Sequence, residues 1–147
     1  MAMTNVVRLL RERGLFEDMT HPELEEAVES PVTVYAGFDP TSNSLQAGNF
    51  VTIMALAHFQ RCGHRVLALV GGATGMIGDP SGKTSERVLL DRGAVASNAE
   101  GIRENLERFL DFQHPSAPAR IVNNIDWLGG ISFIDFLRDA GKHFRMG

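Results

Sequence analysis

The chain has 147 residues, of which 44% are hydrophobic and 22% are charged, with a formal net charge of −4. This length fits one domain or a large part of one, and a composition near the globular average excludes a chain that is disordered throughout. The negative net charge excludes a basic surface over the whole chain, although a local nucleic-acid site stays possible.

Cys62 is the single cysteine, so no disulfide can form within the chain. No apolar run reaches the roughly 20 residues of a membrane span, and we find no secretory signal. We therefore expect a cytoplasmic protein without a membrane partner.

Residues 1–30 are expected to form a helical segment. Apolar residues at helical spacing predict a short amphipathic helix over 6–13. A second helix is expected around Pro22, which is tolerated in a first helical turn. Thr20 is its expected N-cap, and Glu23 would complete a capping box.

Residues 31–147 alternate between short apolar runs and helical patterns. The apolar and β-branched runs predict buried strands at 32–37 and 65–70, and a third strand at 120–123. Helices are predicted at 49–61, 98–110 and 131–138. Such alternation is typical of parallel strands joined by crossover helices. The predicted fold class is therefore α/β, with this region as the first half of a Rossmann-like, doubly wound domain.

Two loops rich in turn-forming residues, 38–44 and 71–75, each follow a predicted strand. Because ligands of open α/β sheets bind outside the carboxyl ends of the strands, we expect both loops to line one crevice. Glycines that only make tight turns would give the same pattern, so the loops alone do not identify a ligand.

The stretch 82–84, Gly-Lys-Thr, imitates the end of a phosphate-binding P-loop. That motif requires a glycine where this chain has Ile77, and Pro80 removes a backbone N–H from the supposed phosphate cradle. We therefore reject a P-loop. Lys83 and Arg87 can still close on a charged phosphate, and the alternative is that they are solvated surface cations.

His58, Cys62 and His64 lie close together in the sequence. Without a second cluster of ligands, this spacing does not make a usual zinc site. We expect no protein-bound metal.

Longer stretches resemble the class I tyrosyl-tRNA synthetases. VYAGFDPTSNSLQAGNF resembles the first signature of that family and LVGGATGMIGDPSGKTSER the second, and VNNIDW, FLRD and GKHF follow in the same order. The resemblance runs from about Arg8 to Gly147. It implies the amino-terminal half of a Rossmann-like class I catalytic domain. The implied reaction activates tyrosine with ATP, accompanied by Mg²⁺, to tyrosyl-adenylate and transfers the tyrosyl group to tRNA(Tyr). A homodimer is implied for the full-length protein, with tRNA bound through segments beyond this chain.

The resemblance assigns three sets of residues by their positions in the signatures. The tyrosine-binding set is Tyr35, Thr74, Asp79 and Asn124. The ATP-binding set is Gly37, Asp39, Gly48 and Thr52. The catalytic set is Thr41, Gln46, Asn49, Lys83 and Arg87. The chemistry is suitable, because a phenol can hydrogen-bond the substrate phenol, a carboxylate can pair with its ammonium group, and a glycine lets adenine approach the backbone. A core position for Tyr35 and a structural role for Asn124 are the alternatives.

One segment departs from the usual His-Ile-Gly-His of the class, since this chain has Gln46-Ala47-Gly48-Asn49. The two amides can donate hydrogen bonds to ribose or phosphate oxygens, but they cannot carry a positive charge. A non-catalytic relative that binds a nucleotide or adenylate is therefore an alternative.

The sequence given ends at Gly147, about where the family begins the link between the two halves of its catalytic domain. We expect a fragment of a longer synthetase that is inactive alone, rather than a natural short protein. A dimerisation module is a further alternative, suggested by Phe133, Phe136 and Phe144, which ordinary core packing would also explain.

Overall fold

The computed structural model describes residues 4–40, 42, 44–77 and 91–144. Three parallel strands form its sheet in the order β1 (Thr33–Phe38), β2 (Arg65–Val70) and β3 (Arg120–Asn123). Tyr35 is level with Leu67, and Leu69 is level with Val122. The parallel sheet confirms the predicted fold class.

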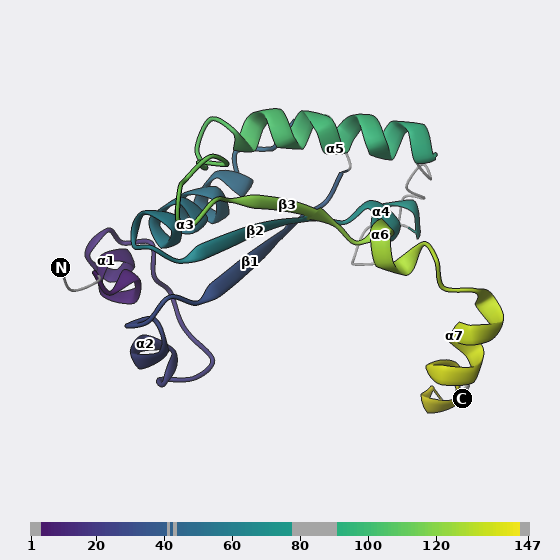
Figure 1. Ribbon diagram of the computed structural model, residues 1–147, viewed down its shortest axis with the longest axis horizontal. Coiled ribbons are helices and arrows are strands. Elements are labelled where there is room, and N and C mark those ends of the chain that lie inside the picture. The colour runs from purple at the N-terminus through teal and green to yellow at the C-terminus, as the bar shows by residue number, and fades with distance from the viewer. Residues whose placement is uncertain (1–3, 41, 43, 78–90, 145–147) are drawn as a thin grey trace.

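Two helices cover one face of this sheet. Figure 1 shows α3 (Asn49–Arg61) and α5 (Arg92–Leu106) on the same side of the strands. The buried core lies between these helices and the sheet, and its larger members are Phe38, Ile53, Leu56, Val66, Val70, Ile102, Leu106 and Leu110. Burial of this apolar surface is the main stabilising contribution to the fold.

The opposite face of β1 is bare. Thr33, Tyr35 and Gly37 are exposed, and they alternate with more buried neighbours along the strand. The prediction of a buried strand is therefore wrong for this face of β1. The physical reason is that α3 and α5, which follow β1 and β2, both pack on the other side.

Two helices were absent from the sequence-based prediction, α4 (Gly72–Ile77) and α6 (Ile125–Leu128). The helix predicted over 98–110 is α5, and it begins at Arg92 rather than at Asn98. It begins earlier because the Asp91 carboxylate caps it by accepting from the Ala94 N–H at 2.8 Å. The helix also ends earlier than predicted, at Leu106.

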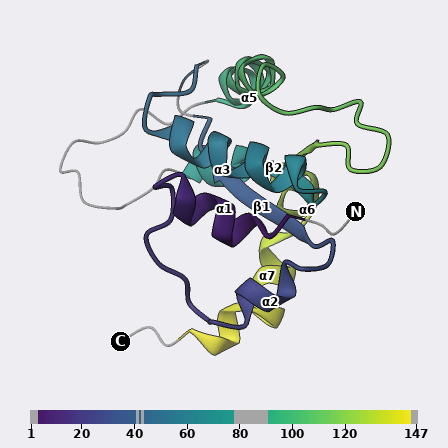
Figure 2. The same ribbon diagram turned by 90° about the vertical axis from the view of Figure 1, so that its left-hand side faces the viewer.

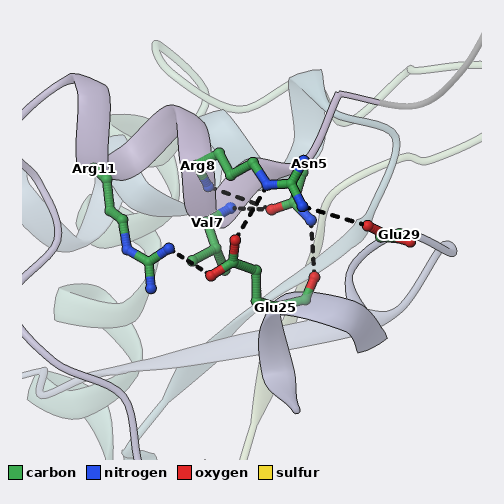
Figure 3. A network of polar contacts seen from close by, with 6 residues as sticks. All are labelled: Asn5, Val7, Arg8, Arg11, Glu25 and Glu29. Carbon is green, nitrogen blue, oxygen red and sulfur yellow. Dashed lines mark hydrogen bonds and ion pairs between the residues drawn. The ribbon is translucent and has the colours of Figure 1, made fainter. Parts of the chain in front are cut away.

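The amino-terminal helices are joined by a polar network. The Asn5 side chain caps α1 (Val6–Glu12) by accepting from Val7 N, and it donates to the backbone oxygen of Glu25 in α2 (Leu24–Ala27). Figure 3 shows the Glu25 carboxylate between Arg8 and Arg11, whose hydrogen bonds lower its pKa. The predicted capping box at Thr20 is wrong, because α2 begins after Glu23 and has no side-chain cap.

A second apolar cluster attaches this segment to the sheet domain. Val6, Val7 and Leu10 of α1 are buried together with Val28 and Cys62. Figure 2 shows α1 alongside α3. His58 is also buried, within α3.

His64, the residue before β2, is fully buried beside Val32, the residue before β1. Its Nδ1 accepts from the Val32 N–H at 3.3 Å, and no described residue pairs with its Nε2. Burial lowers the pKa of His64 from 6.5, and burial followed by the charges of Arg13 and Arg61 lowers that of His58. The unfolded chain therefore binds protons more readily than the folded chain below about pH 6.5.

We predict that acid destabilises the protein through these histidines. The stabilising contribution of neutral His64 is complete above about pH 6.5 and is lost as the pH falls through the lowered value. The His64→Asn variant, whose side-chain oxygen can accept from Val32, should lose less stability than the wild type between neutral pH and about pH 5.5. Urea unfolding at both pH values measures this, with exposed His21→Asn as the control. An unchanged pH slope in His64→Asn would contradict the prediction.

The carboxyl-terminal helices lie away from the sheet (Figure 1). They are α7 (Phe133–Asp139) and the 3-10 turn η1 (Gly141–His143). Phe133, Phe136 and Phe144 are exposed, so they do not belong to the core of the described chain. Among the described helices, none is long and apolar enough to cross a membrane.

Candidate functional site

Polar groups meet where the three strands end. Asp39 follows β1, the segment 71–74 follows β2, and Asn123 and Asn124 stand at the end of β3. The Gly71 N–H donates to Phe38 O, and the Asn124 N–H donates to Val70 O, both at 3.0 Å. Figure 1 shows α4 and α6 together at this end of the sheet. Open α/β sheets bind ligands at this position, which is where the two loops were expected to lie.

The two asparagines hold the beginning of α4. Asn123 Oδ1 accepts from Gly72 N at 3.1 Å, and Asn124 Oδ1 accepts from Ala73 N at 2.7 Å. Asn124 Nδ2 also donates to Thr74 Oγ1 at 3.2 Å, and that hydroxyl donates to Gly71 O at 3.2 Å. Asn124 is only 8% exposed, so it supports Thr74 from inside the fold.

The loop after β1 is fixed from two sides. Asn98 of α5 donates to Pro40 O at 2.9 Å. A Cβ built on Gly75 of α4 would lie 3.2 Å from Pro40 Cγ, so α4 packs closely on the proline. A Cβ built on Gly71 would lie 3.3 Å from Asp39 Oδ1, which places this carboxylate beside the start of α4. Asp39 and Thr74 therefore belong to one group.

Two further predicted residues lie on the bare face of β1. The Tyr35 side chain is 71% exposed, which excludes a core position for it in the described chain. Gly37 is exposed as well, and a Cβ built on it meets nothing within 4 Å. The structure thus leaves both open to a ligand or to further polypeptide.

The segment that departs from the family signature begins α3. Asn49 Oδ1 accepts from the Gln46 N–H at 3.2 Å, so this oxygen is engaged locally. Gly48 is exposed with open space around it, and Thr52 is half-buried in the helix. Gln46 lines a hollow of about 390 Å³ beside the edge-to-face rings of Phe50 and Phe109.

Four predicted residues, Thr41, Asp79, Lys83 and Arg87, lie outside the described residues. Within the described ranges, no group of three or more His, Cys, Asp or Glu side chains is placed to hold a metal ion.

Three residues that support the site were not among the predicted site residues: Asn123, Asn98 and Pro40. Each acts on a segment far along the chain, such as Asn123 on Gly72 and Asn98 on Pro40. The only local signal was the neighbouring pair of asparagines directly after a strand, which resembles other turn-forming sequences.

The parallel sheet, its crossover helices and the polar groups gathered at the strand ends define a protein of the Rossmann-like α/β class. The family model described as "tRNA synthetases class I (W and Y)" matches residues 26–147. The chain belongs to that family, which confirms the predicted relationship.

Several relatives that are more than 50% identical to this chain carry the name tyrosine–tRNA ligase. The chain is 57% identical over 144 residues to that of Protochlamydia amoebophila, covering 98% of this chain and 34% of the relative. It is 52% identical to that of Cytophaga hutchinsonii, again covering 98% of this chain and 34% of the relative. The chain therefore spans about a third of the length of these curated relatives.

Solved structures agree with this family assignment. A C-terminally truncated mitochondrial tyrosyl-tRNA synthetase of Aspergillus nidulans superposes with a TM-score of 0.74 at 28% identity. The match covers 98% of this chain and 44% of that one. The corresponding enzyme of Coccidioides posadasii gives a TM-score of 0.73 at 26% identity, covering 98% and 42%.

Proposed function

We propose that the protein to which this chain belongs is a tyrosine–tRNA ligase, which forms tyrosyl-adenylate from tyrosine and ATP and then transfers the tyrosyl group to tRNA(Tyr). The observation that carries the proposal is the 57% identity over 98% of the chain to a relative of that name. The polar groups gathered at the ends of the three strands support it, because they occupy the place where this fold binds its substrates. Residues 31–147 would supply the first half of the catalytic domain, with residues 1–30 as its helical extension.

In this proposal the chain acts by positioning and by charge stabilisation. A carboxylate oxygen of tyrosine attacks the α-phosphorus of ATP, and the bond from that phosphorus to the bridging oxygen breaks. Pyrophosphate leaves with the electron pair. Thr74 and Asp79 would hold the substrate ammonium group, and Tyr35 would hydrogen-bond the phenol. Lys83 and Arg87 would stabilise the charge that develops on pyrophosphate.

The nucleotide would lie between the loop after β1 and the start of α3. Gly37 and Asp39 would line it from the strand end, and Gly48 would let adenine pack on the backbone. Three residues would contact the phosphates through hydroxyl or amide groups: Thr41, Gln46 and Asn49. Thr52 would meet the ribose, and Mg²⁺ would accompany ATP on its phosphates. Asn124 would complete the tyrosine site by supporting Thr74.

Tyrosine-dependent exchange of pyrophosphate into ATP tests the proposal. We would measure it on residues 1–147 and on a chimera in which this chain replaces the matching segment of the Protochlamydia amoebophila ligase. We expect exchange with tyrosine in the chimera, none with tryptophan, and none from the isolated chain. The Asp79→Asn variant of the chimera should lose at least about tenfold in exchange, since the substrate ammonium group loses its charged partner. A chimera that binds tyrosine and ATP without exchange would contradict the proposal.

That contrary outcome would favour a second function, a nucleotide or adenylate binder without catalysis. The specific observation behind it is Gln46-Ala47-Gly48-Asn49, where no histidine supplies a positive charge and Asn49 Oδ1 is already bonded to Gln46 N. Replacing both Gln46 and Asn49 of the chimera by histidine distinguishes the two functions. Exchange that appears only after both replacements would assign the binding role to the natural sequence.

We propose further that the protein is a cytoplasmic homodimer that binds tRNA through segments beyond this chain. The exposed apolar side chains of the carboxyl-terminal helices support a dimer contact, with Phe133 72% and Ile134 69% exposed. Contiguous apolar exposure of this kind marks interaction surfaces. A second copy fits such a face, because most soluble oligomers are symmetric dimers.

We predict that Phe133→Glu shifts the chimera from dimer to monomer, because the charge would have to be buried in an apolar contact. Light scattering after size-exclusion chromatography measures the mass over a range of concentrations. Glu29→Gln in α2, on another part of the surface, is the control and should leave the mass unchanged. A Phe133→Glu chimera that stays dimeric would place the contact elsewhere.

A further inference from the structure

Asn123 is the last residue of β3, and no role was assigned to it by the resemblance. We propose that it is a positioning residue for the tyrosine site, since its side chain fixes the first turn of α4 and thereby places Thr74. The inference rests on the proposed function, and it gives Asn123 no contact with substrate.

One oxygen of Asn123 joins two helices. Its Oδ1 accepts from Gly72 N at 3.1 Å and from Ile125 N at 3.2 Å, at the beginnings of α4 and α6. The first N–H groups of a helix have no acceptor within the helix. Asn124 Oδ1 takes the next N–H of α4, that of Ala73, at 2.7 Å. Consecutive asparagines at the end of β3 thus satisfy consecutive N–H groups of α4.

The fit between Asn123 and Gly72 leaves no room for a side chain. A Cβ built on Gly72 would overlap Asn123 Oδ1 and would lie 2.8 Å from Nδ2. The glycine is therefore what allows the amide to reach the backbone N–H. With two glycines in six residues, α4 has low intrinsic helix propensity and depends on such outside contacts.

Thr74 follows directly within this first turn. Its hydroxyl accepts from Asn124 Nδ2 and donates to Gly71 O, each at 3.2 Å. Both contacts require the turn to keep its place on the strand ends. Loss of the Asn123 contact would let the turn shift, and the Thr74 hydroxyl would move with it. Of the nucleotide residues, Asp39 lies beside this turn, whereas Gly48 and Thr52 belong to the start of α3. The larger effect should therefore fall on tyrosine.

The test uses pyrophosphate exchange in the Protochlamydia amoebophila chimera, with tyrosine and ATP varied separately. We expect Asn123→Ala to raise the KM for tyrosine about tenfold, as for the loss of about one partly buried hydrogen bond. The KM for ATP should change less than about twofold, a split that general destabilisation would not produce. Asn123→Asp keeps an acceptor oxygen and should stay near the wild-type KM for tyrosine.

Gly72→Ala disrupts the same contact by changing the residue that donates to Asn123. It should reproduce the effect of Asn123→Ala on the KM for tyrosine, and the double variant should be no worse than Asn123→Ala alone, because both changes remove the Asn123–Gly72 contact. Amide hydrogen exchange on residues 1–147 gives a readout independent of activity. The Gly72 N–H should exchange faster in Asn123→Ala than in the wild type and remain protected in Asn123→Asp.

The possible failures are distinct. An active chimera in which Asn123→Ala leaves the KM for tyrosine unchanged, or raises both KM values equally, overturns this inference alone. A chimera without any tyrosine-dependent exchange overturns the proposed function and this inference with it.

Discussion

Replacing Gln60 by alanine is expected to lower the free energy of unfolding by about 2–3 kcal/mol. Gln60 is 5% exposed in α3, and its amide holds the connector before β3. Nε2 donates to Asp111 O at 2.6 Å and to Ala117 O at 3.0 Å, while Oε1 accepts from Asp111 N at 2.9 Å. Alanine would leave three backbone groups without these partners, at least one of them in a buried position.

Urea unfolding followed by circular dichroism measures this effect on residues 1–147. Gln113→Ala, in the same connector but exposed, is the matched control and should change the free energy of unfolding by less than about 0.5 kcal/mol. Equal losses in the two variants would show that the Gln60 contacts do not stabilise the connector.

Replacing Leu106 by alanine is expected to cost about 2–5 kcal/mol, because it opens a cavity in the main core. Leu106 is 0% exposed at the end of α5 and belongs to the same buried cluster as Phe38 and Val66. Leu24→Ala in α2 is the matched control, since that leucine is 43% exposed. The same urea experiment should give a loss below about 1 kcal/mol for the control. A small loss for Leu106→Ala would mean that α5 is not firmly packed on the sheet.

The strands and the long crossover helices could be predicted from sequence because their signals are local. Runs such as 65–70 and 120–123 are short and apolar, and the strands match the prediction there residue for residue. Helix boundaries were less predictable. Asp91 caps α5 ahead of a stretch whose apolar spacing is weak, so the helix began before its pattern did.

The short helices α4 and α6 were not predicted, and for α4 the reason is different. In α4, Gly72 and Gly75 argue against a helix in isolation. The helix forms because Asn123 and Asn124, about fifty residues further on, accept its first N–H groups. Only the folded chain brings these residues together, so no local rule contains the information.

The sequence by itself determined the family, the parallel α/β class and the two strand-end loops of the candidate site, because these depend on motif wording and on periodicity along the chain. The tertiary structure decided which residues support that site. It placed Asp39 and Thr74 together, left Tyr35 on a bare face and made Asn123 and Gln60 the anchors of distant backbone. The physical reason is that hydrogen bonding and burial depend on neighbours in space, and those neighbours are set only when the helices pack on the sheet.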